Sequence, residues 1–103
     1  MERVEIGELV LDIKPRRAFV NGAKIRLVGK QWEFAEALAL SLGGMVTREY
    51  LLACLHPDPK NRPGLRSIDM HASKLRKTLA ARLEGANYVH STRDGGYRLQ
   101  PPA

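Results

Sequence analysis

The stretch RSIDMHASKLRKTL, residues 66–79, predicts an amphipathic helix with two different faces. At about 100° per residue, Ile68, Ala72, Leu75 and Leu79 fall within a sector roughly 60° wide. The residues that cluster on the opposite side are Arg66, Met70, Ser73, Lys74 and Lys77. The apolar sector indicates a face that packs on a core, and the opposite face needs another explanation.

The excess positive charge of the chain is concentrated around this helix. The net charge is +6, and residues 60–82 hold seven of the 17 Lys and Arg residues but only one acid, Asp69. The remaining residues carry ten basic and ten acidic side chains and are neutral in sum. A local excess of this kind is typical of a surface that binds an anionic partner.

The composition indicates a small folded domain in a reducing compartment. The chain has 103 residues, of which 44% are hydrophobic and 27% charged, so there is room for one core. Cys54 is the only cysteine, which excludes an intramolecular disulfide and favours a buried structural thiol. No apolar run suits a membrane span and the N-terminus does not resemble a signal peptide, so we expect a cytoplasmic location and no membrane partner.

The first part of the chain predicts an antiparallel sheet over about residues 4–28. Leu9, Leu11 and Ile13 alternate with other positions, and Asn21-Gly22 separates two β-prone runs. Asn-Gly between such runs is a strong hairpin signal. We therefore expect a sheet with one apolar face and one face in contact with water.

Three helices are expected between about residues 30 and 83. The first starts at Lys30 and ends at the Gly43-Gly44 pair, with an apolar repeat of Trp32, Ala35, Leu38, Ala39 and Leu42. Thr47 is expected to cap a second helix that Pro57 ends. The third covers about residues 67–83, and Gly85 is its expected C-terminal cap.

The last part predicts a hairpin over about residues 87–99, with turn formers in TRDGG, residues 92–96. Gly95 and Gly96 are expected to allow the turn, and Tyr97 to anchor the hairpin to the core. Strands, three helices and a hairpin, in that order, indicate an α+β fold. We therefore predict one winged helix-turn-helix domain over residues 1–103, with the last hairpin as its wing.

Four stretches carry a resemblance to a known family over about residues 6–99. They are VNGAKIRLVGKQWEF (20–34), GGMVTREYLLACLH (43–56), RSIDMHASKLRKTL (66–79) and YVHSTRDGGYRL (88–99). Their order and spacing resemble the effector domains of OmpR/PhoB-type response regulators of two-component systems. The resemblance implies a third helix in the DNA major groove, a wing in the minor groove, and a loop between the second and third helices that touches RNA polymerase.

The resemblance also implies which residues contact DNA. On the third helix it assigns Arg66, Ser67, Met70, Ser73, Lys74, Arg76 and Lys77, on the wing Arg93, and near phosphates Arg48 and His56. Among these, Lys74 is our first choice for a base contact, and Arg66 and Lys77 suit the phosphate backbone. Met70 is an apolar residue on a polar face, where it suits a thymine methyl group. Arg93 suits a narrow minor groove.

The sequence departs from the family pattern at several positions. Val28 stands where a helix-capping Thr is usual, so we expect an incomplete capping box and a weaker start of the first helix. Ser73 replaces a common basic residue, and Asp94 replaces a glycine beside the wing arginine. Residues 1–103 include no receiver domain. We expect either a piece of a longer regulator or a regulator without a phosphorylation switch of its own.

The sequence predicts a sequence-specific regulator of transcription that binds double-stranded DNA, on tandem or paired half-sites, and that needs no cofactor. The alternative is a protein-interaction module that binds RNA polymerase or another regulator through the proline-rich 57–65 loop. Structured RNA is disfavoured because no aromatic platform accompanies the basic segment. An enzyme is not expected, since no nucleophile is paired with a base, and His56, His71, His90 and Cys54 match no zinc spacing.

Overall fold

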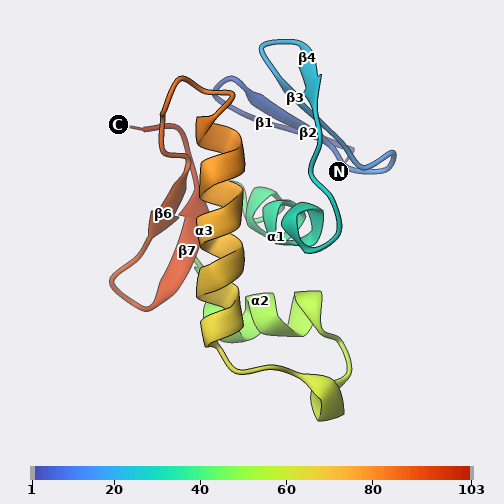
Figure 1. Cartoon of the computed structure of the whole chain (residues 1–103), viewed down its shortest axis with the longest axis vertical. Coiled ribbons are helices and arrows are strands. Elements are labelled where there is room, and N and C mark those ends of the chain that lie inside the picture. The colour runs from blue at the N-terminus through green and yellow to red at the C-terminus, as the bar shows by residue number, and fades with distance from the viewer. Residues whose placement is uncertain (1, 103) are drawn as a thin grey trace.

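The computed structural model describes residues 2–102, in which two antiparallel sheets flank three α-helices (Figure 1). The elements, in chain order, are β1 (Arg3–Ile6), β2 (Leu9–Asp12), β3 (Arg17–Val20), β4 (Ala23–Ile25), α1 (Lys30–Ala39), β5 (Val46–Thr47), α2 (Arg48–Leu55), the 3₁₀ turn η1 (Pro59–Asn61), α3 (Arg66–Ala80), β6 (Val89–Ser91) and β7 (Gly96–Leu99). This order confirms the predicted α+β winged-helix fold. Within the described residues, no helix has the length and apolarity needed to cross a bilayer.

The N-terminal sheet has the strand order β1-β2-β3-β4 and presents one face to the core. The inward residues are Val4, Ile6, Leu9, Leu11, Ala18, Val20 and Ile25, all of which are buried. Asn21 and Gly22 both have positive φ, at 51° and 81°, as a type I′ turn requires. The hairpin predicted from Asn-Gly is confirmed, and so is the alternation of buried and exposed residues.

Helix α1 begins at the predicted residue but ends earlier than its apolar pattern indicates. The N-cap is Gly29 and not Val28, and no side-chain hydrogen bond caps the helix. At the other end the helix stops at Ala39, and Leu42 has a φ of 51°. The prediction that Leu42 continues the buried stripe is wrong, because its left-handed backbone turns it out of the helix and leaves it 64% exposed.

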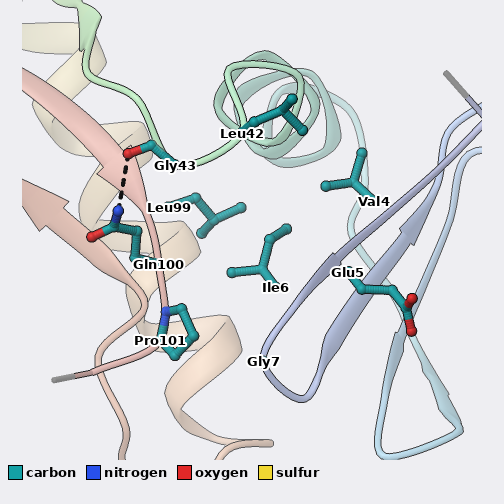
Figure 2. Close-up of a pocket in the computed structure, with 9 residues that line it drawn as sticks. All are labelled: Val4, Glu5, Ile6, Gly7, Leu42, Gly43, Leu99, Gln100 and Pro101. Carbon is teal, nitrogen blue, oxygen red and sulfur yellow. Dashed lines mark hydrogen bonds between the residues drawn. The ribbon is translucent and has the colours of Figure 1, made fainter.

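Leu42 instead borders an open cleft between the two sheets (Figure 2). The cleft has a volume of about 300 Å³ and is lined on one side by β1 and on the other by the end of β7. Val4, Ile6 and Leu99 supply apolar surface, and Gln100 donates a hydrogen bond to the Gly43 carbonyl at 3.1 Å. The other residues that line the cleft are Glu5, Gly7 and Pro101.

Helices α2 and α3 form the helix-turn-helix. The Thr47 hydroxyl accepts a hydrogen bond from the Tyr50 amide at 3.0 Å, which confirms the predicted cap of α2. Helix α3 begins at Arg66 and ends at Ala80, three residues before the predicted boundary at Leu83. Beyond Ala80 the chain continues as a turn in which the Leu83 amide donates to the Leu79 carbonyl at 2.9 Å. The turn ends where Glu84 and Gly85 have φ of 55° and 81° and the Gly85 amide donates to the Ala80 carbonyl at 2.8 Å.

The wing is the β6–β7 hairpin, and β5 adds a third strand to its sheet, in the order β5-β7-β6. At the turn, the Gly96 amide donates to the Thr92 hydroxyl at 3.0 Å and Gly95 has a φ of 78°. Tyr97 is buried, and its ring meets Phe34 of α1 edge-to-face at 5.9 Å. Tyr97 therefore anchors the wing to the core, as predicted.

Candidate nucleic-acid interface

The free face of α3 is the centre of the candidate interface. In Figure 1, α3 lies between the β6–β7 hairpin and α1. Its apolar sector, Ile68, Ala72, Leu75 and Leu79, is buried, which confirms the prediction from residues 66–79. The exposed members of the opposite sector are Arg66, Met70, Lys74 and Lys77, with Met70 50% exposed. Three cationic groups and one apolar side chain are thus available to a partner on a single helix face.

The two serines of α3 are less accessible than these residues. Both Ser67 and Ser73 are half-buried. The Ser67 hydroxyl donates to the Gly64 carbonyl at 2.9 Å, so it joins the first turn of α3 to the preceding loop. Ser67 therefore has a local structural partner, whereas Ser73 lies beside Lys74 on the edge of the free face.

Arg76 is directed toward the wing and away from the free face. Its Nε and Nη2 donate to the Val89 carbonyl at 3.1 and 2.9 Å, and Nε is also within 3.2 Å of the Asn87 Oδ1. These bonds hold the half-buried guanidinium against β6. The structure therefore does not bring Arg76 together with Lys74 and Lys77, although Arg76 and Lys77 are adjacent in the sequence.

Arg48, at the first position of α2, belongs to a three-residue cluster that the sequence did not indicate. Its Nε and Nη2 donate to the Asp69 carboxylate at 2.6–3.0 Å, and the Tyr97 hydroxyl donates to the same carboxylate at 2.5 Å. The hydrogen bond from Tyr97, and next that from Arg48, lower the pKa of Asp69. The only signal for this cluster was that Asp69 is the single acid in a basic segment.

His56 is the C-cap of α2, and its backbone is tied to the following loop. The Arg62 Nε donates to the His56 carbonyl at 2.8 Å. The imidazole is half-buried, and its Nε2 has no hydrogen-bond partner among residues 2–102. His56 therefore lies where the connection from α2 to α3 begins, near enough to His71 to affect the pKa of that histidine.

Arg93 is exposed at the tip of the wing, next to the exposed Asp94. Both lie in the turn between Ser91, the last residue of β6, and Gly96, the first of β7. The turn is closed by a hydrogen bond from the Thr92 amide to the Gly96 carbonyl at 3.0 Å. A closed turn with an arginine at its tip suits insertion into a narrow groove.

His71 is the half-buried histidine on the flank of α3, as predicted from the sequence. Burial is the main factor that lowers its pKa, and the Coulombic effects of Lys74, His56 and Lys30 lower it further against an opposing effect of Glu33. The folded protein therefore binds this proton less readily than the unfolded chain, whose histidine pKa is about 6.5. As the pH falls below that value, protonation favours the unfolded chain.

We expect the free energy of unfolding to decrease between about pH 7 and about pH 5, and the H71Q variant to show a smaller decrease. Urea unfolding of both proteins at several pH values measures the difference. The variant keeps every other titratable side chain, so the difference between the two proteins reports the loss of His71. An equal pH dependence in both proteins would contradict this assignment.

Among the described residues, no group of three or more His, Cys, Asp and Glu side chains could hold a metal ion. The candidate interface itself consists of cationic, hydroxyl and apolar side chains. Such groups are suited to phosphates, base edges and methyl groups.

The comparisons with known proteins agree with the fold. Residues 22–99 match the family model described as "Transcriptional regulatory protein, C terminal". Over 99 residues the chain is 32% identical to the cell cycle transcriptional regulator CtrA of Caulobacter vibrioides, a match that covers 96% of this chain and 42% of CtrA. The chain thus spans about two fifths of the length of the curated relatives it matches.

Two solved structures are similar over nearly the whole chain. The DNA-binding domain of CpxR from E. coli has a TM-score of 0.80 and 30% identity, with 100% of both chains covered. The response regulator DrrB of Thermotoga maritima, an OmpR/PhoB homolog, has a TM-score of 0.80 and 27% identity, with 96% of this chain and 44% of DrrB covered. The segment that matches the family model contains every residue of the candidate interface.

Proposed function

The chain belongs to the family of C-terminal domains of transcriptional regulatory proteins, of the OmpR/PhoB type, and we propose that it binds double-stranded DNA sequence-specifically to regulate transcription. It acts either by itself or as the effector domain of a longer regulator. We further propose that residues 1–103 function as one winged-helix domain, because residues of both sheets and all three helices share one hydrophobic core.

The observation that carries this proposal is the free face of α3. Residues 60–82 account for the whole net charge of the chain, and Arg66, Lys74 and Lys77 are exposed on that face. If these cations contacted only water, there would be no reason for the excess positive charge of the chain to be confined to this one segment. Contacts from Lys and Arg to phosphates release counterions and supply affinity that decreases with salt.

We infer a division of roles among the exposed residues. Lys74, in the middle of the free face, contacts a base edge in the major groove, and Met70 contacts a thymine methyl group. Arg66 and Lys77 contact phosphates on either side, and these contacts set the register of α3 on the duplex. Arg93 enters the minor groove, whose enhanced negative potential attracts arginine where the groove is narrow.

Selection from a random pool of double-stranded DNA tests the proposal. The purified chain is incubated with the pool at moderate salt, and the retained DNA is sequenced. An enriched motif is expected, and paired half-sites in it would support binding as two copies, since one recognition helix of this length reads a short site. Failure to retain DNA, or retention without any enriched motif, would contradict sequence-specific binding.

The K74A variant is expected to lose about tenfold to a hundredfold in affinity for the selected site, because one good base contact contributes about 1–3 kcal/mol. Affinity for unrelated DNA should fall much less. The matched control is K24A, which removes an exposed lysine from β4, outside the basic segment. Equal losses in both variants would contradict the assignment of Lys74 to a base contact.

A second candidate is a protein-interaction surface on the 57–65 loop, which would bind RNA polymerase or another regulator. Internal hydrogen bonds support it: the Asp58 carboxylate accepts from the Lys60 amide at 3.0 Å and from the Asn61 side chain at 2.7 Å. Arg62 adds its bond to the His56 carbonyl. A preformed loop loses little conformational entropy on binding. Deletion of residues 59–63 should leave DNA affinity intact if the loop serves only a protein partner.

A further inference from the structure

Asp69 is out of place on an electrostatic argument. It is the only acid between residues 60 and 82, and it lies one residue before the exposed Met70 on α3. An unpaired carboxylate next to a phosphate-binding face would repel DNA. Its presence there calls for a favourable interaction that compensates for this repulsion.

The contribution of the Arg48–Asp69 ion pair to protein stability is too small to explain why an acid is present at this position. The Arg48 and Asp69 side chains are 37% and 39% exposed, and ion pairs this accessible to solvent contribute little to stability. Their geometry is more informative than their energy. Arg48 binds side-on, through Nε and Nη2, so both donors on this edge of the guanidinium are used. In residues 2–102, the Arg48 Nη1 makes no hydrogen bond.

The same carboxylate also holds the wing, next to its turn. The Tyr97 hydroxyl of β7 donates to the Asp69 Oδ1 that accepts from the Arg48 Nε. Asp69 is 21 residues from Arg48 and 28 from Tyr97 in the sequence. One side chain of α3 thus connects α2, α3 and the wing, the three elements of the DNA-binding surface in the proposed function.

We propose that Asp69 is a positioning residue, which orients Arg48 so that its free Nη1 meets a phosphate and holds the wing in register with α3. This inference rests on the proposed function. A guanidinium that is already oriented loses less side-chain entropy on binding than a mobile one. The gain in oriented contacts outweighs the repulsion from one negative charge.

A positioning role for Asp69 changes DNA affinity in the direction opposite to that expected from its negative charge alone. Removing a negative charge from a DNA-binding surface should strengthen binding, whereas removing a positioning residue should weaken it. Asp94 supplies the matched control, because it is exposed beside Arg93 and its carboxylate has no partner in the described part of the chain. The D69N and D94N variants make the same chemical change at these two sites.

We expect D69N to remain folded and to bind the selected DNA site about tenfold more weakly than the unaltered chain, with a salt dependence lower by about one phosphate contact. D94N should bind as tightly as the unaltered chain or more tightly, with no reduction in that salt dependence. Titrations at several salt concentrations give both quantities, and urea unfolding reports stability separately. R48K should resemble D69N, since Lys keeps the charge but cannot bind side-on.

Tighter or unchanged DNA binding by D69N would overturn the positioning role while leaving the proposed function intact. Absence of specific DNA binding by the unaltered chain would overturn both. If D69N does not fold, Y97F decides the question, because it removes one hydrogen bond to Asp69 and keeps the buried ring. A reduced affinity of folded Y97F for the site then supports the proposal, and an unchanged affinity overturns it.

Discussion

Replacement of Phe34 by alanine is expected to lower the free energy of unfolding by about 3–5 kcal/mol. The Phe34 side chain is fully buried in α1 and meets the Tyr97 ring edge-to-face, so it connects the first helix to the wing sheet. Its removal leaves a cavity at the point where these elements meet. Urea unfolding followed by circular dichroism measures the loss, from the midpoint and the slope of the transition.

Phe19 provides a matched control, since it is the other of the two phenylalanines in the chain. It is half-buried on the outward face of β3, between Val10 and Lys24 on the neighbouring strands. F19A should cost about 1 kcal/mol, the usual size of a cross-strand contribution. Equal losses in F34A and F19A would contradict the position of Phe34 at the centre of the core.

Substitution of Gly96 by alanine is expected to cost about 3 kcal/mol or more and to weaken the pairing of β5 with β7. A Cβ atom at this position would overlap the Val46 carbonyl oxygen and would lie 2.6 Å from the Met45 sulfur. Met45 can move aside, but Val46 is in the backbone of the paired strand β5. The strands must therefore separate to accommodate even one methyl group.

A comparison with the G95A variant separates the steric effect of a methyl group from the effect of backbone conformation. Gly95 has a φ of 78° and open space where a methyl group would lie, so G95A should cost only the left-handed backbone penalty of about 1 kcal/mol. Thermal or urea unfolding of both variants gives the comparison. A larger loss for G95A than for G96A would show that turn conformation, rather than contact with β5, determines the glycine requirement.

Features that depend on neighbouring residues were predictable from the sequence. The two faces of α3 follow from its 3.6-residue period, the Asn21-Gly22 turn from the freedom of these residues at positive φ, and the cap of α2 from the Thr47 hydroxyl. The charge excess in residues 60–82 likewise needed only the order of residues. These features together indicated the fold and an anionic partner.

Local patterns did not determine the details that depend on distant segments. The period of α1 extends through Leu42, but the backbone turns there and exposes that side chain. Arg76 and Lys77 are adjacent and both basic, yet only the packing of β6 beside α3 directs Arg76 to the Val89 carbonyl. A side chain with several favourable orientations takes the one for which the folded chain supplies a partner.

The order of residues is therefore enough to specify the succession of elements, the buried face of α3 and the place of the charge, because these follow from periodicity, turn chemistry and composition. Packing between distant segments is needed to explain why Gly96 must lack a side chain and why Asp69 joins Arg48 to Tyr97. The atoms of that cluster come within a few ångströms although 21 residues separate Arg48 from Asp69 and 28 separate Asp69 from Tyr97. Local sequence patterns cannot predict such contacts, because the residues come together only when the core forms.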